Sequence, residues 1–115
     1  MNKSQPLISV VLTTYNRYEL FIQAYDSILN QTYVNLDIII VDDFSNENEY
    51  SFFENYIVDS RTRYIRHSQN FGLAKARNTG IKSSNGLFIC FCDDDDIWLP
   101  NKITSQLEAY KKSPA

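Results

Sequence analysis

The chain has 115 residues, of which 43% are hydrophobic, and this fits one globular domain with a core of its own. Its net charge of −3 at pH 7 argues against binding through a general basic surface, so we expect no nucleic-acid partner. The apolar runs are too short to span a membrane and the first six residues lack the apolar core of a signal peptide, so we expect no membrane segment and a cytoplasmic location.

Apolar stretches alternate with turn-forming residues along the whole chain. Residues 8–13 are almost continuously apolar and rich in β-branched side chains, as in a strand buried on both faces. Residues 20–30 carry apolar side chains at helical spacing, which predicts an amphipathic helix. The alternation continues and predicts strands at 37–41, 63–66 and 87–92, with helices that start within 45–48 and end at 57, run over 73–82, and run from Pro100 to Tyr110.

The two cysteines lie in the last predicted strand. Cys90 and Cys92 flank Phe91, so in an extended strand both side chains point to the same face of the sheet. Two cysteines with this spacing favour a place in the core over a zinc site or a disulfide framework.

Strand and helix alternate four times without an internal repeat or linker. This pattern predicts an α/β fold in which helices on both faces cover a mainly parallel sheet. We expect the strand order 3-2-1-4, which places the first and fourth strands side by side at the switch point where open α/β sheets bind ligands. Residues 13–16 and 93–96 would then face each other across one cleft, and Asp43 would enter it from the second strand.

Four consecutive aspartates, residues 93–96, directly follow the last predicted strand. Neighbouring carboxylates repel one another, so the cluster calls for a bound cation or a ring of donors. Oxygen ligands favour Mg²⁺ or Mn²⁺, which commonly bridge carboxylates to the phosphates of a substrate. The alternative is a solvated acidic turn that caps the following helix. The position after a buried strand favours the cation site.

Four regions of the chain contain sequence motifs of several residues each. They read VVLTTYNR at 10–17 with SILNQTY at 27–33, IIVDDFS at 39–45, NFGLAKARNTG at 70–80 and DDDDIWLP at 93–100. In this order and spacing they resemble the family 2 glycosyltransferases of the GT-A fold, with the aspartate run at the DXD region. The resemblance implies a Rossmann-like three-layer α/β/α fold, a nucleotide-diphosphate sugar as donor, UDP-sugar by first choice, and Mn²⁺ or Mg²⁺ as cofactor.

The resemblance also implies how the nucleotide base is held. A pyrimidine offers a flat face to an aromatic side chain and a ring N–H to a carboxylate, and Tyr15 and Asp43 would take these two parts, with Thr13 nearby. A core or rim aromatic is the alternative for Tyr15. For Asp43 the alternative is a helix cap.

The DXD pattern implies that Asp95 is the first choice as metal ligand and Asp93 the second. Along an extended strand end these two side chains point one way, whereas Asp94 and Asp96 point the other. Asp94 would contact ribose hydroxyls, and Asp96 would cap the segment that follows. Because four identical residues stand in a row, a register shifted by one place, which exchanges these roles, is the alternative.

Two further side chains carry expectations. The guanidinium of Arg77 suits a phosphate or a nearby aspartate, and its alternative is a solvated or core-bridging arginine. His67 is the only histidine, and a lone histidine is more often found at the surface or in a loop than in catalysis.

For an inverting transferase the resemblance implies a single displacement, in which the metal-held diphosphate leaves as a carboxylate base takes the proton of the acceptor hydroxyl. Family members supply that base, and most of the acceptor site, well downstream of the DXD region. This chain ends at Ala115, and Glu108 stands alone on a predicted helix. We therefore expect residues 1–115 to be a single nucleotide-sugar-binding domain, the N-terminal part of a truncated glycosyltransferase domain, with the catalytic base beyond Ala115.

By family analogy the acceptor would be a glycan or a lipid-linked glycan, and absent regions could associate with the cytoplasmic face of a membrane. A surface left open by missing strands could favour a homodimer. The main alternative function is a non-catalytic nucleotide-binding or interaction fragment. A phospho-receiver domain is a remote one, since its acidic pair follows the first strand, whereas Asp42 and Asp43 follow the second. A calcium loop starting at Asp93 would need glycine at its sixth place, which is Trp98.

Overall fold

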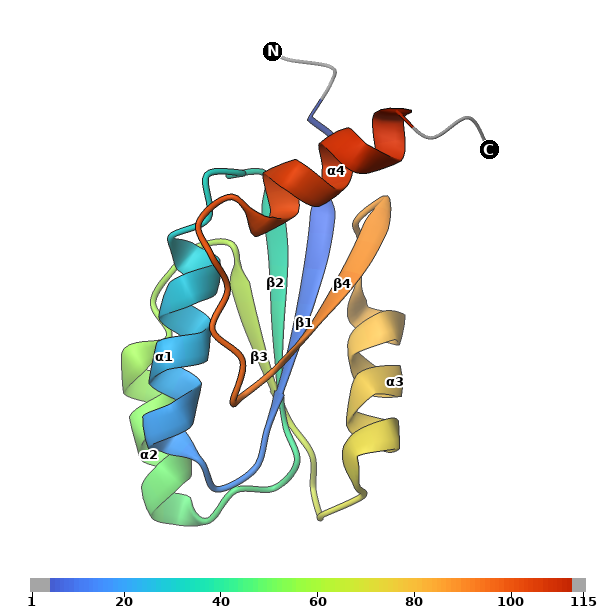
Figure 1. Ribbon diagram of the computed structural model, residues 1–115. Helices are drawn as coiled ribbons and strands as arrows, with labels where there is room; N and C mark the ends of the chain where they lie inside the picture. The colour runs from blue at the N-terminus through green and yellow to red at the C-terminus, as the bar shows by residue number, and fades with distance from the viewer. Residues whose placement is uncertain (1–4, 113–115) are drawn as a thin grey trace.

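A computed structural model describes residues 5–112 of the protein (Figure 1). Within this range strands and helices alternate as predicted, and each expected element is present. The order is β1 (Ile8–Thr14), α1 (Tyr18–Leu29), β2 (Leu36–Asp42), α2 (Glu47–Tyr56), β3 (Thr62–Arg66), α3 (Leu73–Ser83), β4 (Phe88–Asp93) and α4 (Lys102–Lys112).

The four strands form one parallel sheet in the order β3-β2-β1-β4, which confirms the predicted topology. Ile8 at the start of β1 is in register with Leu36 of β2 on one side and Phe88 of β4 on the other. The chain therefore reverses its direction of travel across the sheet between β3 and β4. The carboxyl ends of β1 and β4 lie side by side, although some eighty residues separate them in sequence.

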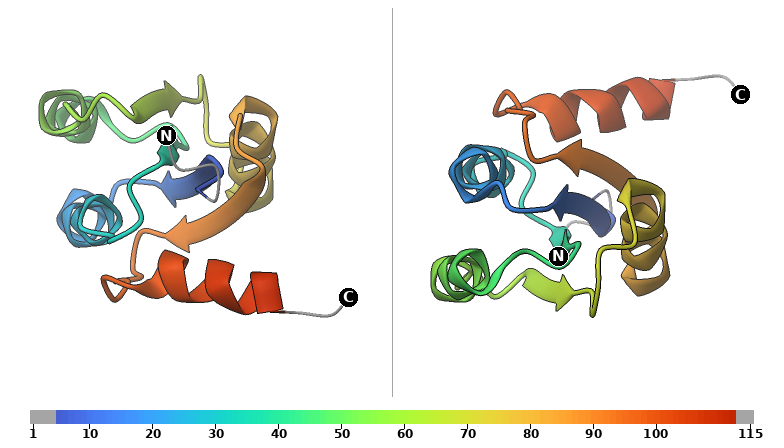
Figure 2. Two further views of the ribbon diagram at one scale, coloured as in Figure 1. Left: turned by 90° about the horizontal axis from the view of Figure 1, so that it is seen from above. Right: turned by 90° about the horizontal axis from the view of Figure 1, so that it is seen from below.

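Helices cover both faces of the sheet, so the three-layer α/β/α arrangement is confirmed (Figure 2). On one face, residues such as Val10 and Leu12 of β1 pack with α1, α2 and α4 around the larger core. On the other face, Val11 packs against α3 in a smaller core. Gly80 brings α3 close to the sheet, because a Cβ atom at this position would lie 2.3 Å from a methyl carbon of Val11.

β4 is covered unequally on its two faces. Cys90 and Cys92 point to the larger core and are free thiols, as the sequence predicted. On the opposite face Leu87, Ile89 and Phe91 remain 72%, 38% and 45% exposed. Among residues 5–112, α3 lies over β1 and β2 and leaves this apolar face of β4 open. No helix in the described range has the length and apolar character needed to cross a membrane.

The loops at the carboxyl ends of β1 and β2 are fastened to each other. Asp42 is fully buried and accepts hydrogen bonds from the backbone N–H and the hydroxyl of Ser45, at 2.9 and 2.6 Å, and from the hydroxyl of Tyr64. The Ser45 hydroxyl oxygen in turn accepts from the backbone N–H of Asn16 at 2.8 Å. Asn16 and Phe44 adopt positive φ angles of 52° and 74° at these turns. This network fixes the loop ends that surround the switch point.

Candidate functional site

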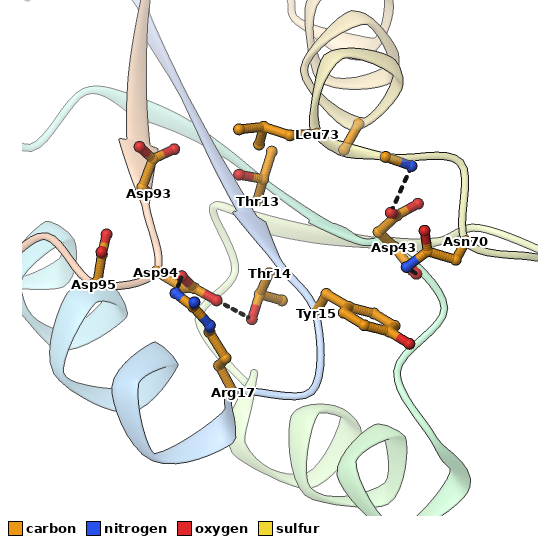
Figure 3. Close-up of a pocket in the computed structure, with 12 residues that line it drawn as sticks. Thr13, Thr14, Tyr15, Arg17, Asp43, Asn70, Leu73, Asp93, Asp94 and Asp95 are labelled. Carbon is orange, nitrogen blue, oxygen red and sulfur yellow. Dashed lines mark hydrogen bonds and ion pairs between the residues drawn. The ribbon is translucent and has the colours of Figure 1, made fainter.

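A cleft of about 440 Å³ opens at the carboxyl ends of the central strands, where the topology predicted it (Figure 3). The loop after β1 faces the aspartate run after β4, and Asp43 enters from the β2 side, so the predicted meeting of these three segments is confirmed. The cleft is lined by Thr13, Thr14, Tyr15, Arg17, Asp43, Asn70, Gly72, Leu73, Ala76, Asp93, Asp94 and Asp95.

Asp43 is buried, and three donors hold its carboxylate. Oδ1 accepts from the backbone N–H of Phe71 at 2.9 Å and faces Nδ1 of His67 at 2.8 Å, while Oδ2 accepts from the backbone N–H of Gly72 at 2.8 Å. Burial by itself raises the pKa of Asp43, but the hydrogen bonds from His67 and the two backbone amides outweigh it, so the pKa is lowered. The side chain is therefore an ionised carboxylate that anchors the glycine turn before α3.

His67 lies in the loop that follows β3, as expected, but it is only 8% exposed and therefore not at the surface. Besides Asp43, its ring contacts the hydroxyl oxygen of Thr79 on α3 through Nε2, at 2.8 Å. The residue type alone could not reveal these contacts of His67. They depend on the sheet order, which brings the end of β3 beside Asp43.

Tyr15 and Thr13 occupy different depths of the cleft. Thr13 is buried at the end of β1, whereas the Tyr15 side chain on the following loop is 45% exposed. In Figure 3 its ring lies below Asp43, and Arg17 lies to its left. Tyr15 is thus a rim aromatic with an accessible ring face, which is compatible with stacking on a planar ligand.

Asp93 and Asp94 each pair with one arginine. Asp93, the last residue of β4, contacts Arg77 at 3.2 Å, which is the nearby-aspartate alternative proposed for Arg77. Asp94 is buried and accepts from the Thr14 hydroxyl at 3.1 Å and from Arg17 at 3.2 Å. Burial raises the pKa of Asp94 despite these two partners.

The aspartate run does not stay extended. β4 ends at Asp93, and a turn follows in which the backbone N–H of Asp96 donates to the carbonyl oxygen of Asp93 at 3.0 Å. A carboxylate oxygen of Asp96 accepts from the backbone N–H of Asp93 at 3.2 Å, so the expectation that Asp96 points away with Asp94 and caps the next segment was wrong. Oxygens of Asp93, Asp95 and Asp96 lie within 4.8 Å of one another. This all-oxygen set fits Mg²⁺ or Mn²⁺.

Arg77 is half-exposed on α3 and is not among the residues that line the cleft. Its Nε is buried without a hydrogen-bond partner among the described residues. A phosphate contact by Arg77 therefore stays a prediction, while its contact with Asp93 places it beside the carboxylate cluster.

Sequence reasoning named no role for six of the lining residues. Arg17 and Thr14 belong to the first matching segment, and the ion pair of Arg17 with Asp94 gave no signal because 77 residues separate the two. Asn70 and Gly72 lie in the glycine turn, which the pattern at 70–80 did indicate. Leu73 and Ala76 lie on the first turns of α3 and read as ordinary helix residues.

Several known proteins resemble this chain in sequence. The model of glycosyl transferase family 2 matches residues 9–115. An uncharacterised glycosyltransferase of Rickettsia bellii is 41% identical over 101 residues, which cover 88% of this chain and 14% of the relative. The UDP-Glc:alpha-D-GlcNAc-diphosphoundecaprenol beta-1,3-glucosyltransferase WfgD of Escherichia coli is 35% identical over 108 residues, 93% of this chain and 42% of that protein. The chain thus spans less than half the length of either relative.

Solved structures share the fold. TarS of S. aureus in complex with UDP superposes with a TM-score of 0.82 at 23% identity, over 91% of this chain and 32% of that chain. The mannosyltransferase PcManGT from Pyrobaculum calidifontis, in complex with GDP-Man and Mn²⁺, gives 0.79 at 22% identity, over 96% of this chain and 33% of that chain. These similarities show the GT-A fold. Because the family model also matches nearly the whole chain, this protein belongs to glycosyl transferase family 2.

Proposed function

We propose that this chain is the donor-binding part of a glycosyltransferase and that its cleft holds a nucleotide-diphosphate sugar, a UDP-sugar by first choice, together with Mn²⁺ or Mg²⁺. The observation that carries the proposal is one cleft with two chemically different sides. Tyr15 and Asp43 lie on one side, and the carboxylates of Asp93 and Asp95 lie on the other (Figure 3). The UDP in the TarS structure and the GDP-Man and Mn²⁺ in PcManGT support a ligand of this class.

On the base side, the hydrogen-bond count of Asp43 fits a ring N–H donor. A carboxylate offers about four acceptor positions. Two donors occupy Oδ1 and one occupies Oδ2, which leaves one position on Oδ2 for the ligand. Uracil presents one ring N–H, and the exposed ring of Tyr15 would stack on its flat face, with Thr13 beside it.

On the phosphate side, Asp93 and Asp95 would hold the divalent ion, and the turn places Asp96 near enough to join them. When bound, the ion would neutralise charge on the leaving diphosphate. Arg77 would hold Asp93 in place or contact a phosphate oxygen. Asp94, already fixed by Thr14 and Arg17, would accept from ribose hydroxyls.

The reaction we propose is transfer of the sugar to an acceptor hydroxyl with inversion, with acceptor site and base outside residues 5–112. Glu108 does not suit the role of base, since α4 lies by the amino ends of β1 and β4, away from the cleft (Figure 1). The name of WfgD supports a lipid-linked glycan as acceptor, and such an acceptor would bring the whole protein to a membrane surface. The homodimer stays a prediction, and the open apolar face of β4 is the surface it would bury.

Titration calorimetry with UDP, with and without Mn²⁺, tests the proposal. We expect binding that Mn²⁺ strengthens by at least about tenfold, because the crowded carboxylates repel the diphosphate without an ion between them. UDP affinity that is the same with and without Mn²⁺, or no binding by protein shown to be folded, would contradict the donor-site assignment. Hydrolysis of a UDP-sugar by this chain alone would contradict the placement of the base outside it.

A further inference from the structure

His67 uses both ring nitrogens, and neither contact reaches the reacting part of the proposed ligand. Nδ1 lies 2.8 Å from Asp43 Oδ1, and Nε2 lies 2.8 Å from the hydroxyl oxygen of Thr79. Its backbone N–H donates to the carbonyl oxygen of Asp42 at 2.8 Å, so the main chain is fixed as well. The ring also makes a T-shaped contact with Phe71, with centroids 5.2 Å apart. A buried side chain with this set of partners holds one orientation.

The partners decide which nitrogen carries a proton. An ionised Asp43 only accepts hydrogen bonds, so Nδ1 must be an N–H donor. The Thr79 hydroxyl is more adaptable, because it lies 3.1 Å from the carbonyl oxygen of Lys75 and can donate either there or to Nε2. Nε2 can therefore act as acceptor in the neutral ring or as donor in the charged ring. In both states the Nδ1–H bond to Asp43 is kept.

That bond determines which acceptor position of Asp43 stays open. Oδ1 receives both His67 and the Phe71 amide, whereas Oδ2 receives the Gly72 amide alone. The terminal torsion of an aspartate is soft, and the two backbone amides, which come from adjacent residues and bind one oxygen each, restrict it only in part. The histidine donor on Oδ1 adds a third fixed direction and leaves the one remaining lone pair on Oδ2.

We propose that His67 is a positioning residue for nucleotide-base selectivity, which orients the Asp43 carboxylate so that Oδ2 is presented to a ring N–H of the base. This inference rests on the proposed function, in which Asp43 faces the base. It assigns to His67 a role through Asp43, with no contact to the ligand itself.

Two substitutions separate the contacts of His67. His67→Asn keeps an amide donor near the position of Nδ1 and loses the reach to Thr79. His67→Gln places its amide near the position of Nε2 and loses the bond to Asp43. Thr79→Val removes the Nε2 partner at nearly constant shape and serves as the matched control.

The measurement is the ratio of the dissociation constants for CDP and UDP, by calorimetry with Mn²⁺ present. Cytosine has no proton at the ring nitrogen where uracil has one, so an ionised, oriented Asp43 disfavours it. We expect this ratio to fall by about tenfold in His67→Gln and to stay within roughly threefold of wild type in His67→Asn and Thr79→Val. A merely structural role would weaken both nucleotides equally, and an unchanged ratio in folded His67→Gln overturns the proposal.

Failure of the proposed function looks different, because wild-type protein would then bind neither nucleotide, or both equally. A second measurement needs no ligand and no variant. Long-range ¹H–¹⁵N spectra of the wild type should show His67 with a protonated Nδ1 at every pH at which the protein is folded and Asp43 ionised. A neutral ring that carries its proton on Nε2 overturns the proposal, whatever the nucleotide titrations show.

Discussion

The two sides of the cleft handle negative charge in different ways. On the β2 side, one buried carboxylate, Asp43, receives two backbone amides and a histidine N–H. On the β4 side, four carboxylates crowd into one turn, and the described residues provide ion pairs only to Asp93 and Asp94. The pKa of Asp43 is lowered by its donors, whereas burial raises the pKa of Asp94.

The Asp43 carboxylate has all its charge compensated without a ligand, whereas the aspartate turn after β4 has carboxylates without a partner of opposite charge among the described residues. Donors already fixed in the fold stabilise ionised Asp43, so the Asp43 side of the cleft is preorganised. Asp95 and Asp96 are exposed and have no salt bridge within residues 5–112, and their oxygens lie close to those of Asp93. A bound divalent ion would supply on the β4 side what the backbone and His67 supply on the β2 side.

We expect the largest effect on stability from a substitution of Asp43. Asp43→Asn removes the charge and turns an NH₂ group toward one or two of the three donors, so we expect the free energy of unfolding to fall by about 3 kcal/mol. Urea denaturation at pH 7 measures this. Asp95→Asn is the matched control, since that side chain is exposed, and it should change stability by no more than ~0.5 kcal/mol. Equal stability of wild type and Asp43→Asn would show that the three donors do not stabilise the charge.

The same contrast predicts a pH dependence. Since the folded-state pKa of Asp43 is lowered, its contribution is fully present above the unfolded value of about 3.9 and is lost as pH falls through the lower folded value. The stability gap between wild type and Asp43→Asn should therefore be widest near pH 7 and shrink below about pH 4. Denaturation curves at both pH values test this, and a gap that grows in acid contradicts the assignment.

The next largest effect concerns the aspartate turn after β4 and its expected metal ion. Asp95→Ala should remove the strengthening of UDP binding by Mn²⁺, a loss of about tenfold or ~1.4 kcal/mol in the presence of the metal. Calorimetry with and without Mn²⁺ measures it. Glu108→Ala, an acidic side chain on α4 away from the cleft, is the control and should leave the metal effect intact. If both variants lose it equally, the metal effect comes from overall charge and not from this turn.

A smaller effect of opposite sign is expected at Asp94. A raised folded-state pKa means that the charged form is disfavoured by folding, so this stability contribution is present below the unfolded pKa and lost as pH rises through the folded one. Asp94→Asn removes the charge, keeps a carbonyl acceptor for Arg17 and offers its NH₂ group to the Thr14 hydroxyl oxygen, so stability at pH 7 should rise by no more than ~1 kcal/mol. A loss as large as that of Asp43→Asn would mean that the two sides do not differ.

The smallest effect lies next to Asp43. Phe44 has a φ of 74°, which costs a residue other than glycine roughly 1 kcal/mol, while the Arg66 guanidinium lies 4.8 Å from the centre of its ring. Phe44→Gly relieves the strain and loses the contact, so stability should change by no more than about 0.5 kcal/mol. Phe44→Leu keeps the strain and loses the ring, and its thermal unfolding midpoint should be the lower of the two.

The sequence allowed the fold to be predicted well because its pattern is global. A run of β-branched apolar residues such as 38–41 favours a strand buried on both faces, and the alternation with helices restricts the topology to parallel crossovers. The side chains of the site were harder to place, since their partners are distant in sequence. The turn that returns Asp96 to Asp93 is local, yet four identical residues give no signal of where the strand ends.

The position of His67 also could not be predicted from the sequence. Its partners Asp43 and Thr79 come from β2 and α3, and only the sheet order brings them together. An expectation based on residue type alone takes no account of these two partners. The number of donors on a buried carboxylate becomes countable only when the backbone amides of Phe71 and Gly72 have been placed.

The pairing of β1 with β4 sets the order in which the molecule can assemble. β1 can meet β2 once about 40 residues exist, but its other edge stays open until residues 88–93 have been synthesised. Contacts between such distant segments form slowly, because the intervening chain loses entropy when its ends meet. During synthesis on the ribosome, therefore, the Asp43 side of the cleft can form before the carboxylate cluster, which the nascent chain gains only with the last strand.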